Sequence, residues 1–164
     1  MEQVDFAFQH IGLERSEPLR CQPQQLDALW KTALVLVLNE QGEACRLSSQ
    51  QYFYPARNIS LQRPADATFL GLHQEQGFFA ISVAMTQNNV TGTINIRSAA
   101  SDWSSLQSSI FAQAKALLHW QSQSKFCGRC GGLVDLKSAG YSAACSSCGL
   151  ITYPQSHPAV IMSV

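Results

Sequence analysis

Residues 127–149 read CGRCGGLVDLKSAGYSAACSSCG and hold four of the six cysteines of this 164-residue chain. They form two Cys-x-x-Cys pairs with fourteen residues between them: Cys127, Cys130, Cys145 and Cys148. Four thiolates on two tight turns complete the tetrahedral shell that zinc prefers, at about 2.3 Å each. A glycine after each pair, Gly131 and Gly149, permits a left-handed backbone and leaves amides free to donate toward the sulfurs. The pattern predicts a zinc ribbon whose closed shell makes the metal structural.

The residues between the two pairs predict a β-hairpin. Its strands are residues 133–136 and 141–144, and Ser138-Ala139-Gly140 supplies the turn. A module this small, under about 40 residues, rarely folds without a cross-link or a metal. Zinc binding, at an apparent value of about 10–16 kcal/mol, is large enough to stabilise it.

Four cysteines have other possible uses than zinc binding. Iron is an alternative metal for this site, because the ligand set alone does not decide which metal binds. Two disulfides require an oxidising compartment, and no export signal indicates one. A thioredoxin-like redox pair uses one Cys-x-x-Cys at the start of a helix rather than two glycine-flanked pairs.

Composition excludes several classes of protein. Eleven basic residues balance eleven acidic ones, and 46% of the chain is hydrophobic, which is unlike a disordered chain. Because basic residues do not outnumber acidic ones, we do not expect nucleic-acid binding through bulk charge. No run of 18 apolar residues occurs, and residues 1–13 lack the basic and apolar regions of a signal peptide. We therefore expect no membrane partner and a cytoplasmic protein.

The chain before residue 125 predicts a mainly antiparallel β domain with one long helix, so the expected fold class is α+β. Turn signals at residues 39–42 and 74–77 indicate two hairpins, and residues 50–65 read as irregular. The expected strands are residues 33–38, 43–47, 68–72, 78–83 and 90–96.

One helix is expected from about residue 103 to residue 121. Its apolar residues recur at helical spacing on one face: Leu106, Ile110, Phe111, Ala114, Leu117 and Leu118. Ser101 or Asp102 is expected to cap its first turn. This pattern is typical of a helix that packs on a sheet.

No catalytic constellation is visible in the sequence. Cys21 and Cys45 stand alone and are expected to be unligated thiols, and the histidines at positions 10, 73, 119 and 157 show no paired spacing. Phosphate-binding loops, dinucleotide fingerprints and nucleophile elbows are absent. No pair of acidic residues stands out as a catalytic dyad.

The second half of the sequence resembles the NADH pyrophosphatase (NAD diphosphatase) family of Nudix hydrolases. The resemblance rests on an ordered combination: residues 116–120 (ALLHW), 126–131 (FCGRCG), the second cysteine pair, 153–155 (YPQ) and 158–161 (PAVI). It implies an N-terminal domain over residues 1–124, a zinc ribbon over 125–153, and the first strand of a truncated Nudix domain over 154–164.

The resemblance implies cleavage of the pyrophosphate of NADH or NAD to nicotinamide mononucleotide and AMP, and it implies action on NAD-capped RNA ends. It also implies a homodimer, with Mg²⁺ or Mn²⁺ in the catalytic Nudix domain. The Nudix box G-x5-E-x7-R-E-x2-E-E-x-G that holds such ions is absent from these 164 residues. The chain is therefore expected to be a non-catalytic fragment that ends inside the first Nudix strand. The alternative is that residues 158–164 form the last strand of this domain's own sheet.

One substrate-binding residue is implied by position. Tyr153 corresponds to the family's aromatic residue before proline, five places after the last cysteine, and packing of the ribbon is its other expected role. Gln155 stands where many members have Arg and His157 where many have Asp, so neither is assigned a role.

Two other functions compete with this one. The first is a non-catalytic zinc-ribbon module that binds protein or nucleic acid. Only Lys125, Arg129 and Lys137 supply basic charge near the ribbon, which is few for phosphate contacts. The second is a regulatory paralogue without hydrolase activity.

Overall fold

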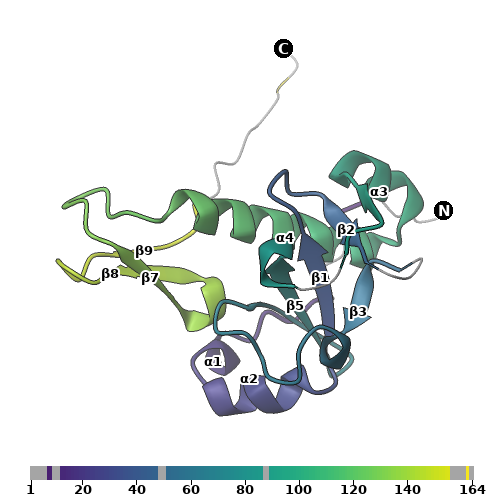
Figure 1. Cartoon of the computed structure of the whole chain (residues 1–164), viewed down its shortest axis with the longest axis horizontal. Coiled ribbons are helices and arrows are strands. Elements are labelled where there is room, and N and C mark those ends of the chain that lie inside the picture. Colours follow the sequence, from purple (N-terminus) through teal and green to yellow (C-terminus); the bar gives the residue numbers. More distant parts are fainter. Residues whose placement is uncertain (1–6, 9–11, 48–50, 87–88, 156–161, 163–164) are drawn as a thin grey trace.

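The structure is a computed structural model, and it describes residues 7–8, 12–47, 51–86, 89–155 and 162. A six-stranded sheet packs along one long helix, α4 (Ser105–Gln123), and a three-stranded ribbon sheet follows the C-terminal end of this helix (Figure 1). His10, His157 and most of the strand expected over residues 154–164 lie outside the described residues.

The larger sheet is mixed, with antiparallel pairs in the majority. Its order is β4-β5-β1-β2-β6, and β3 also pairs with β1. Only β1 and β5 run parallel. The bounds are β1 (Leu34–Leu38), β2 (Ala44–Arg46), β3 (Phe53–Pro55), β4 (Thr68–His73), β5 (Gln76–Ser82) and β6 (Gly92–Ile94). The two expected hairpins, β1–β2 and β4–β5, are confirmed, as is the α+β class.

The continuous apolar sequence of β1 reflects burial on both faces of the sheet. Val35 and Val37 join the cluster beneath α2 (Pro23–Trp30), whereas Leu36 and Leu38 join the cluster beneath α4. A strand that is covered on both sides needs no alternation of polar and apolar residues.

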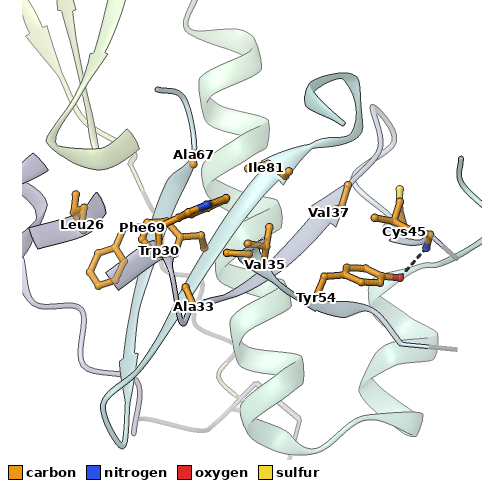
Figure 2. Close-up of a cluster of buried hydrophobic side chains, with 13 residues drawn as sticks. Leu26, Trp30, Ala33, Val35, Val37, Cys45, Tyr54, Ala67, Phe69 and Ile81 are labelled. Carbon is orange, nitrogen blue, oxygen red and sulfur yellow. Dashed lines mark hydrogen bonds between the residues drawn. The ribbon is translucent and has the colours of Figure 1, made fainter. Parts of the chain in front are cut away.

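The cluster on the α2 side is anchored by two large side chains with polar tips (Figure 2). The rings of Trp30 and Phe79 pack edge to face, with 5.2 Å between their centroids. The indole N–H of Trp30 donates a hydrogen bond to the Ser60 carbonyl at 2.9 Å. The Tyr54 hydroxyl accepts the Leu47 N–H at 2.7 Å. Each buried polar tip therefore has a partner, as burial requires.

The long helix is confirmed, but its cap lies elsewhere. Ile110, Phe111, Ala114 and Leu117 are buried against the sheet. Ser104 caps α4 by accepting the Gln107 N–H at 3.3 Å, and the Gln107 side chain accepts the Ser104 N–H in return. This reciprocal pair is a capping box.

The expected cap residues belong to a helix that the sequence did not predict. Ser101 and Asp102 end α3 (Ile96–Asp102), whose own cap is Asn95. The Asn95 side chain accepts the N–H groups of Arg97 and Ser98 at 3.0 Å. The strand expected over residues 90–96 was therefore too long, because this cap starts a helix where the strand was expected to end.

Among the α-helices and strands before residue 125, three others were not predicted. Helices α1 (Glu17–Arg20) and α2 precede the sheet, and β3 lies within the stretch expected to be irregular. These elements have four, eight and three residues, too few for a periodic pattern to show.

In the described part of the chain, no helix has the length and apolar character that a membrane crossing needs.

The ribbon sheet contains the expected hairpin and one further strand. β7 (Val134–Lys137) pairs with β8 (Ser142–Cys145), and β8 pairs with β9 (Ile151–Thr152). The turn falls at Ser138–Gly140, as expected, and we call these three residues the ribbon tip. Tyr141 follows the tip and lies outside the strand expected to contain it.

Candidate functional site

The four cysteines of the ribbon converge on one point. Their sulfur atoms all lie within 4.8 Å of one another, and they are the only such group of potential metal ligands among the described residues. The Sγ atoms of Cys127 and Cys148 are 3.7 Å apart, and those of Cys130 and Cys145 are 3.5 Å apart. A tetrahedral zinc with ligands at about 2.3 Å places sulfurs about 3.8 Å apart. The geometry therefore fits a single zinc ion.

The two cysteine pairs sit on equivalent turns. The Gly131 N–H donates to the Cys127 carbonyl at 2.9 Å, and the Gly149 N–H donates to the Cys145 carbonyl at 3.1 Å. Both glycines have a φ near +70° (72° and 71°), a conformation that costs little only without a side chain. The left-handed backbone expected at these two glycines is therefore confirmed.

Backbone amides around the first cysteine of each pair favour thiolates. Cys145 accepts N–H groups from Cys148 and Ser147, each at 3.4 Å, and these bonds lower the pKa of Cys145 to about 6. The Arg129 amide, with that of Cys130, likewise lowers the pKa of Cys127. Donation to sulfur stabilises the charged form, which is the form that binds metal.

The pKa of Cys130, the second cysteine of the first pair, is shifted in the opposite direction. The Gly132 amide acts to lower the pKa of Cys130, but sharing of its proton with Cys148 and Cys145 raises it to about 12. Zinc would displace this proton and bind all four sulfurs. The resulting shell is closed to water, so the geometry and the donor set together support a structural zinc.

A polar network fixes the ribbon tip against the larger sheet and α4. The Gln121 amide donates to the Gly140 carbonyl and to the Thr68 hydroxyl, both at 2.9 Å. On the previous turns of α4, the Gln113 amide donates to the Leu70 carbonyl at 2.7 Å and to the Tyr141 hydroxyl at 2.5 Å. Because these bonds join α4 and β4 to the ribbon tip and to Tyr141 beside it, the ribbon has a defined orientation on the sheet.

Tyr153 follows β9 and lies outside the thiolate shell. Its side chain is 62% exposed, which leaves the ring available to a ligand. The ring borders a cleft of about 890 Å³ between α1, α4 and the ribbon. Arg20 and Tyr141, two more residues of this cleft, carry no sequence signal of a site, because only the tertiary fold brings α1 to the ribbon tip.

The remaining candidate ligands stay apart from the metal group. Cys45 is fully buried, and this burial raises the pKa of its thiol. Cys21 is exposed beside the cleft, with its sulfur 4.0 Å from the Ser138 hydroxyl oxygen. His119 is exposed on α4, and Nδ1 of His73 lies 3.2 Å from the Gly12 carbonyl oxygen.

Comparison with known proteins gives matches that centre on the ribbon. Residues 122–153 match the NADH pyrophosphatase zinc ribbon domain. Nudix hydrolase 19, chloroplastic, from Arabidopsis thaliana is 39% identical over 71 residues, which is 40% of this chain and 16% of that protein. NAD-capped RNA hydrolase NUDT12 from Homo sapiens is 33% identical over 66 residues, or 35% of this chain and 14% of that protein.

A longer match reaches into the N-terminal part. NAD(P)H pyrophosphatase NUDT13, mitochondrial, from Homo sapiens is 23% identical over 181 aligned residues, which is 82% of this chain and 51% of that protein. The chain spans about half or less of the length of these relatives. The matches confirm the resemblance seen in the sequence: residues 122–153 match the NADH pyrophosphatase zinc ribbon domain, and the chain is similar to a Nudix hydrolase, an NAD(P)H pyrophosphatase and an NAD-capped RNA hydrolase.

Proposed function

We propose that this chain is the N-terminal and zinc-ribbon portion of a Nudix hydrolase that cleaves the pyrophosphate of NADH or NAD. Hydrolysis adds one water across the P–O–P bridge and yields AMP and nicotinamide mononucleotide, which is reduced when the substrate is NADH and oxidised when it is NAD. The observation that carries the proposal is the match of residues 122–153 to the NADH pyrophosphatase zinc ribbon domain, with four cysteines in zinc geometry. The relative named as an NAD-capped RNA hydrolase extends the proposed substrates to NAD-capped RNA.

The zinc in this proposal has a structural role only. Cys127, Cys130, Cys145 and Cys148 are the proposed ligands, and four thiolates leave no position for a water or a phosphate oxygen. Pyrophosphate cleavage needs divalent ions held by carboxylates near the bridging oxygens. The sequence of 164 residues contains no Nudix box to hold Mg²⁺ or Mn²⁺, so the chain alone is proposed to be inactive.

Tyr153 is the proposed substrate-binding residue of this chain. Its exposed ring at the border of the cleft supports a stacking role against a nucleotide base.

The proposed segments keep the expected limits of 1–124, 125–153 and 154–164. The last helix residue of the N-terminal part, Gln123, supports the first of these limits.

Assembly and compartment follow as parts of the same proposal. Large apolar side chains on the ribbon are exposed, including Phe126 at 65% and Leu133 at 63%, which supports a homodimer or a further domain that covers them. Thiolate ligands stay reduced in the cytoplasm, the proposed compartment. Light scattering on the purified chain tests the dimer.

The decisive test uses the chain extended by the sequence downstream of Val164. The extended protein is expected to hydrolyse NADH to reduced nicotinamide mononucleotide and AMP, and NAD to the oxidised mononucleotide and AMP, when Mg²⁺ or Mn²⁺ is added. The 164-residue chain is expected to show only background turnover under the same conditions. An extended protein that stays inactive with every divalent ion would contradict the proposal.

A non-catalytic binding module is the second candidate. The exposed apolar side chains of the ribbon favour a protein partner over a nucleic acid, since the basic charge near them is sparse. A stop codon directly after Val164, together with saturable binding of a protein partner through Phe126, would select this function.

A further inference from the structure

The cleft beside the ribbon joins residues from both ends of the chain. It has a volume of about 890 Å³ and is lined from α1, α4, the ribbon tip and the residues after β9. Figure 1 shows α1 below the ribbon and α4 running above it. The volume lies within the range of about 300–1,000 Å³ that is typical of small-molecule sites.

Arg20 is held in this cleft with its guanidinium group oriented. The guanidinium carbon lies 3.5 Å from the centre of the Tyr141 ring, and Nε donates to the Arg15 carbonyl at 3.0 Å. Within the described part of the chain, no hydrogen bond or ion pair occupies its two terminal amino groups. An arginine fixed by stacking presents these groups as a preorganised fork for a phosphate.

A second cation faces the same space. Arg15 lines the cleft and also forms no ion pair with any described residue. Arg15, Arg20 and Tyr141 line the same cleft. Burial raises the pKa of Tyr141, and the positive charges of Arg20 and Arg15 act against this rise. Glu17 is the one acidic residue that lines the cleft among those described, so the balance of charge is positive.

Aromatic rings complete the lining. Trp120 on α4 and Tyr153 after β9 both border the cleft. Their faces can stack on a heterocyclic base, while the arginines bind the charged end of the same ligand.

We propose that this cleft binds a nucleotide, with its phosphate on Arg15 and Arg20 and its base against Trp120 and Tyr153. The inference rests on the proposed function for its choice of adenine nucleotides as the ligand. It adds a phosphate site that the N-terminal part of the chain contributes. The nucleotide can be free or can stand at the 5′ end of an RNA, because both present the same base and phosphate.

The test is a calorimetric and NMR titration of the zinc-loaded 164-residue chain with AMP. We expect saturable binding that shifts the Trp120 indole N–H signal. Adenosine, which lacks the phosphate, and ribose 5-phosphate, which lacks the base, should each bind at least about tenfold more weakly. A short RNA with a 5′-terminal AMP group that binds more tightly than AMP would identify RNA as the source; equal binding would identify the free nucleotide.

Variants separate the cleft from general charge effects. Arg20→Gln and Arg15→Gln should each weaken AMP binding about tenfold or more, while Arg97→Gln, an exposed arginine on α3, should leave it unchanged. Zinc content and circular dichroism establish that each variant is folded. Equal loss in the Arg97 variant, or inorganic phosphate binding as tightly as AMP, would overturn the proposal.

The outcome is independent of the hydrolysis assay. Absence of AMP binding to the 164-residue chain would overturn the cleft assignment even if the extended protein cleaves NADH. Conversely, an inactive extended protein would overturn the proposed function without altering the AMP titration.

Discussion

The side chain of Gln121 and the carbonyl of Gly140 join the end of the long helix to the ribbon tip, with a hydrogen bond of 2.9 Å between Nε2 and O. The same amide donates to the Thr68 hydroxyl on the sheet. A Cβ at position 140 would lie 2.6 Å from Gln121 Nε2 and 2.8 Å from Thr68 Oγ1. Helix, sheet and ribbon therefore meet where only glycine leaves enough space.

Replacement of Gln121 is expected to destabilise the chain. Gln121→Ala removes the donor to both Gly140 and Thr68, which should lower the free energy of unfolding by about 1–2 kcal/mol. Urea denaturation measures this change. Gln123→Ala is the matched control on the same helix end, because Gln123 is exposed, and it should change stability by less than about 0.5 kcal/mol. Equal effects of the two variants would contradict the network.

Loss of one zinc ligand is expected to unfold the ribbon alone. Cys145→Ser removes a buried thiolate, so zinc content should fall well below one per chain, while the separate cores around α2 and α4 stay folded. Metal analysis and two-dimensional NMR check both parts of the statement. Cys21→Ser should keep one zinc per chain. Chelation of zinc from the wild-type protein should reproduce the spectrum of the Cys145 variant.

The capping box of α4 gives a prediction that distinguishes Ser104, the cap seen in the structure, from Ser101, a cap expected from the sequence. Ser104→Ala removes the side-chain acceptor of the Gln107 N–H and should cost about 1 kcal/mol. Ser101→Ala, at the position first expected to cap this helix, should be nearly neutral because Ser101 is exposed within α3. Thermal denaturation of the two variants distinguishes them, and a larger loss for Ser101→Ala would refute this assignment of the cap.

The two isolated thiols are expected to react at different rates. Cys21 is exposed, whereas Cys45 is buried and its pKa is raised, so at pH 8 a smaller fraction of Cys45 is thiolate. Iodoacetamide should therefore label Cys21 first in the zinc-loaded protein, and Cys45 only after unfolding. A rise in pH increases the thiolate fraction of Cys45 but leaves it inaccessible. Mass spectrometry of peptides follows both sites, and rapid labelling of Cys45 in the folded protein would argue against its burial.

Tyr153 is expected to affect substrate use without affecting zinc. In the extended protein, Tyr153→Ala should lower kcat/KM for NADH about tenfold or more, because a stacking face is lost. Tyr153→Phe keeps the ring and should retain most of the activity. Zinc content should equal that of the wild type in both, since the ring lies outside the thiolate shell. Unchanged kinetics in the alanine variant would leave Tyr153 with a packing role only.

The sequence alone determined the features that depend on nearby residues. Both cysteine pairs lie within 22 residues, and each is followed by a glycine that its turn requires, so the convergence of the four sulfurs could be predicted from spacing. The apolar face of α4 repeats over several turns and gives a periodic signal that short elements lack. The two hairpins of the larger sheet likewise join strands that are adjacent in the sequence.

Only the tertiary structure decided the features that join distant segments. The parallel pairing of β1 with β5 joins strands that more than thirty residues separate, and no local pattern encodes such a partner. The stacking of Arg20 on Tyr141 depends on how α4 and the sheet place α1 beside the ribbon tip. A cap, a turn or a metal pair is stabilised by bonds within a few residues, whereas the cleft exists only after burial of two hydrophobic clusters has fixed the positions of its walls.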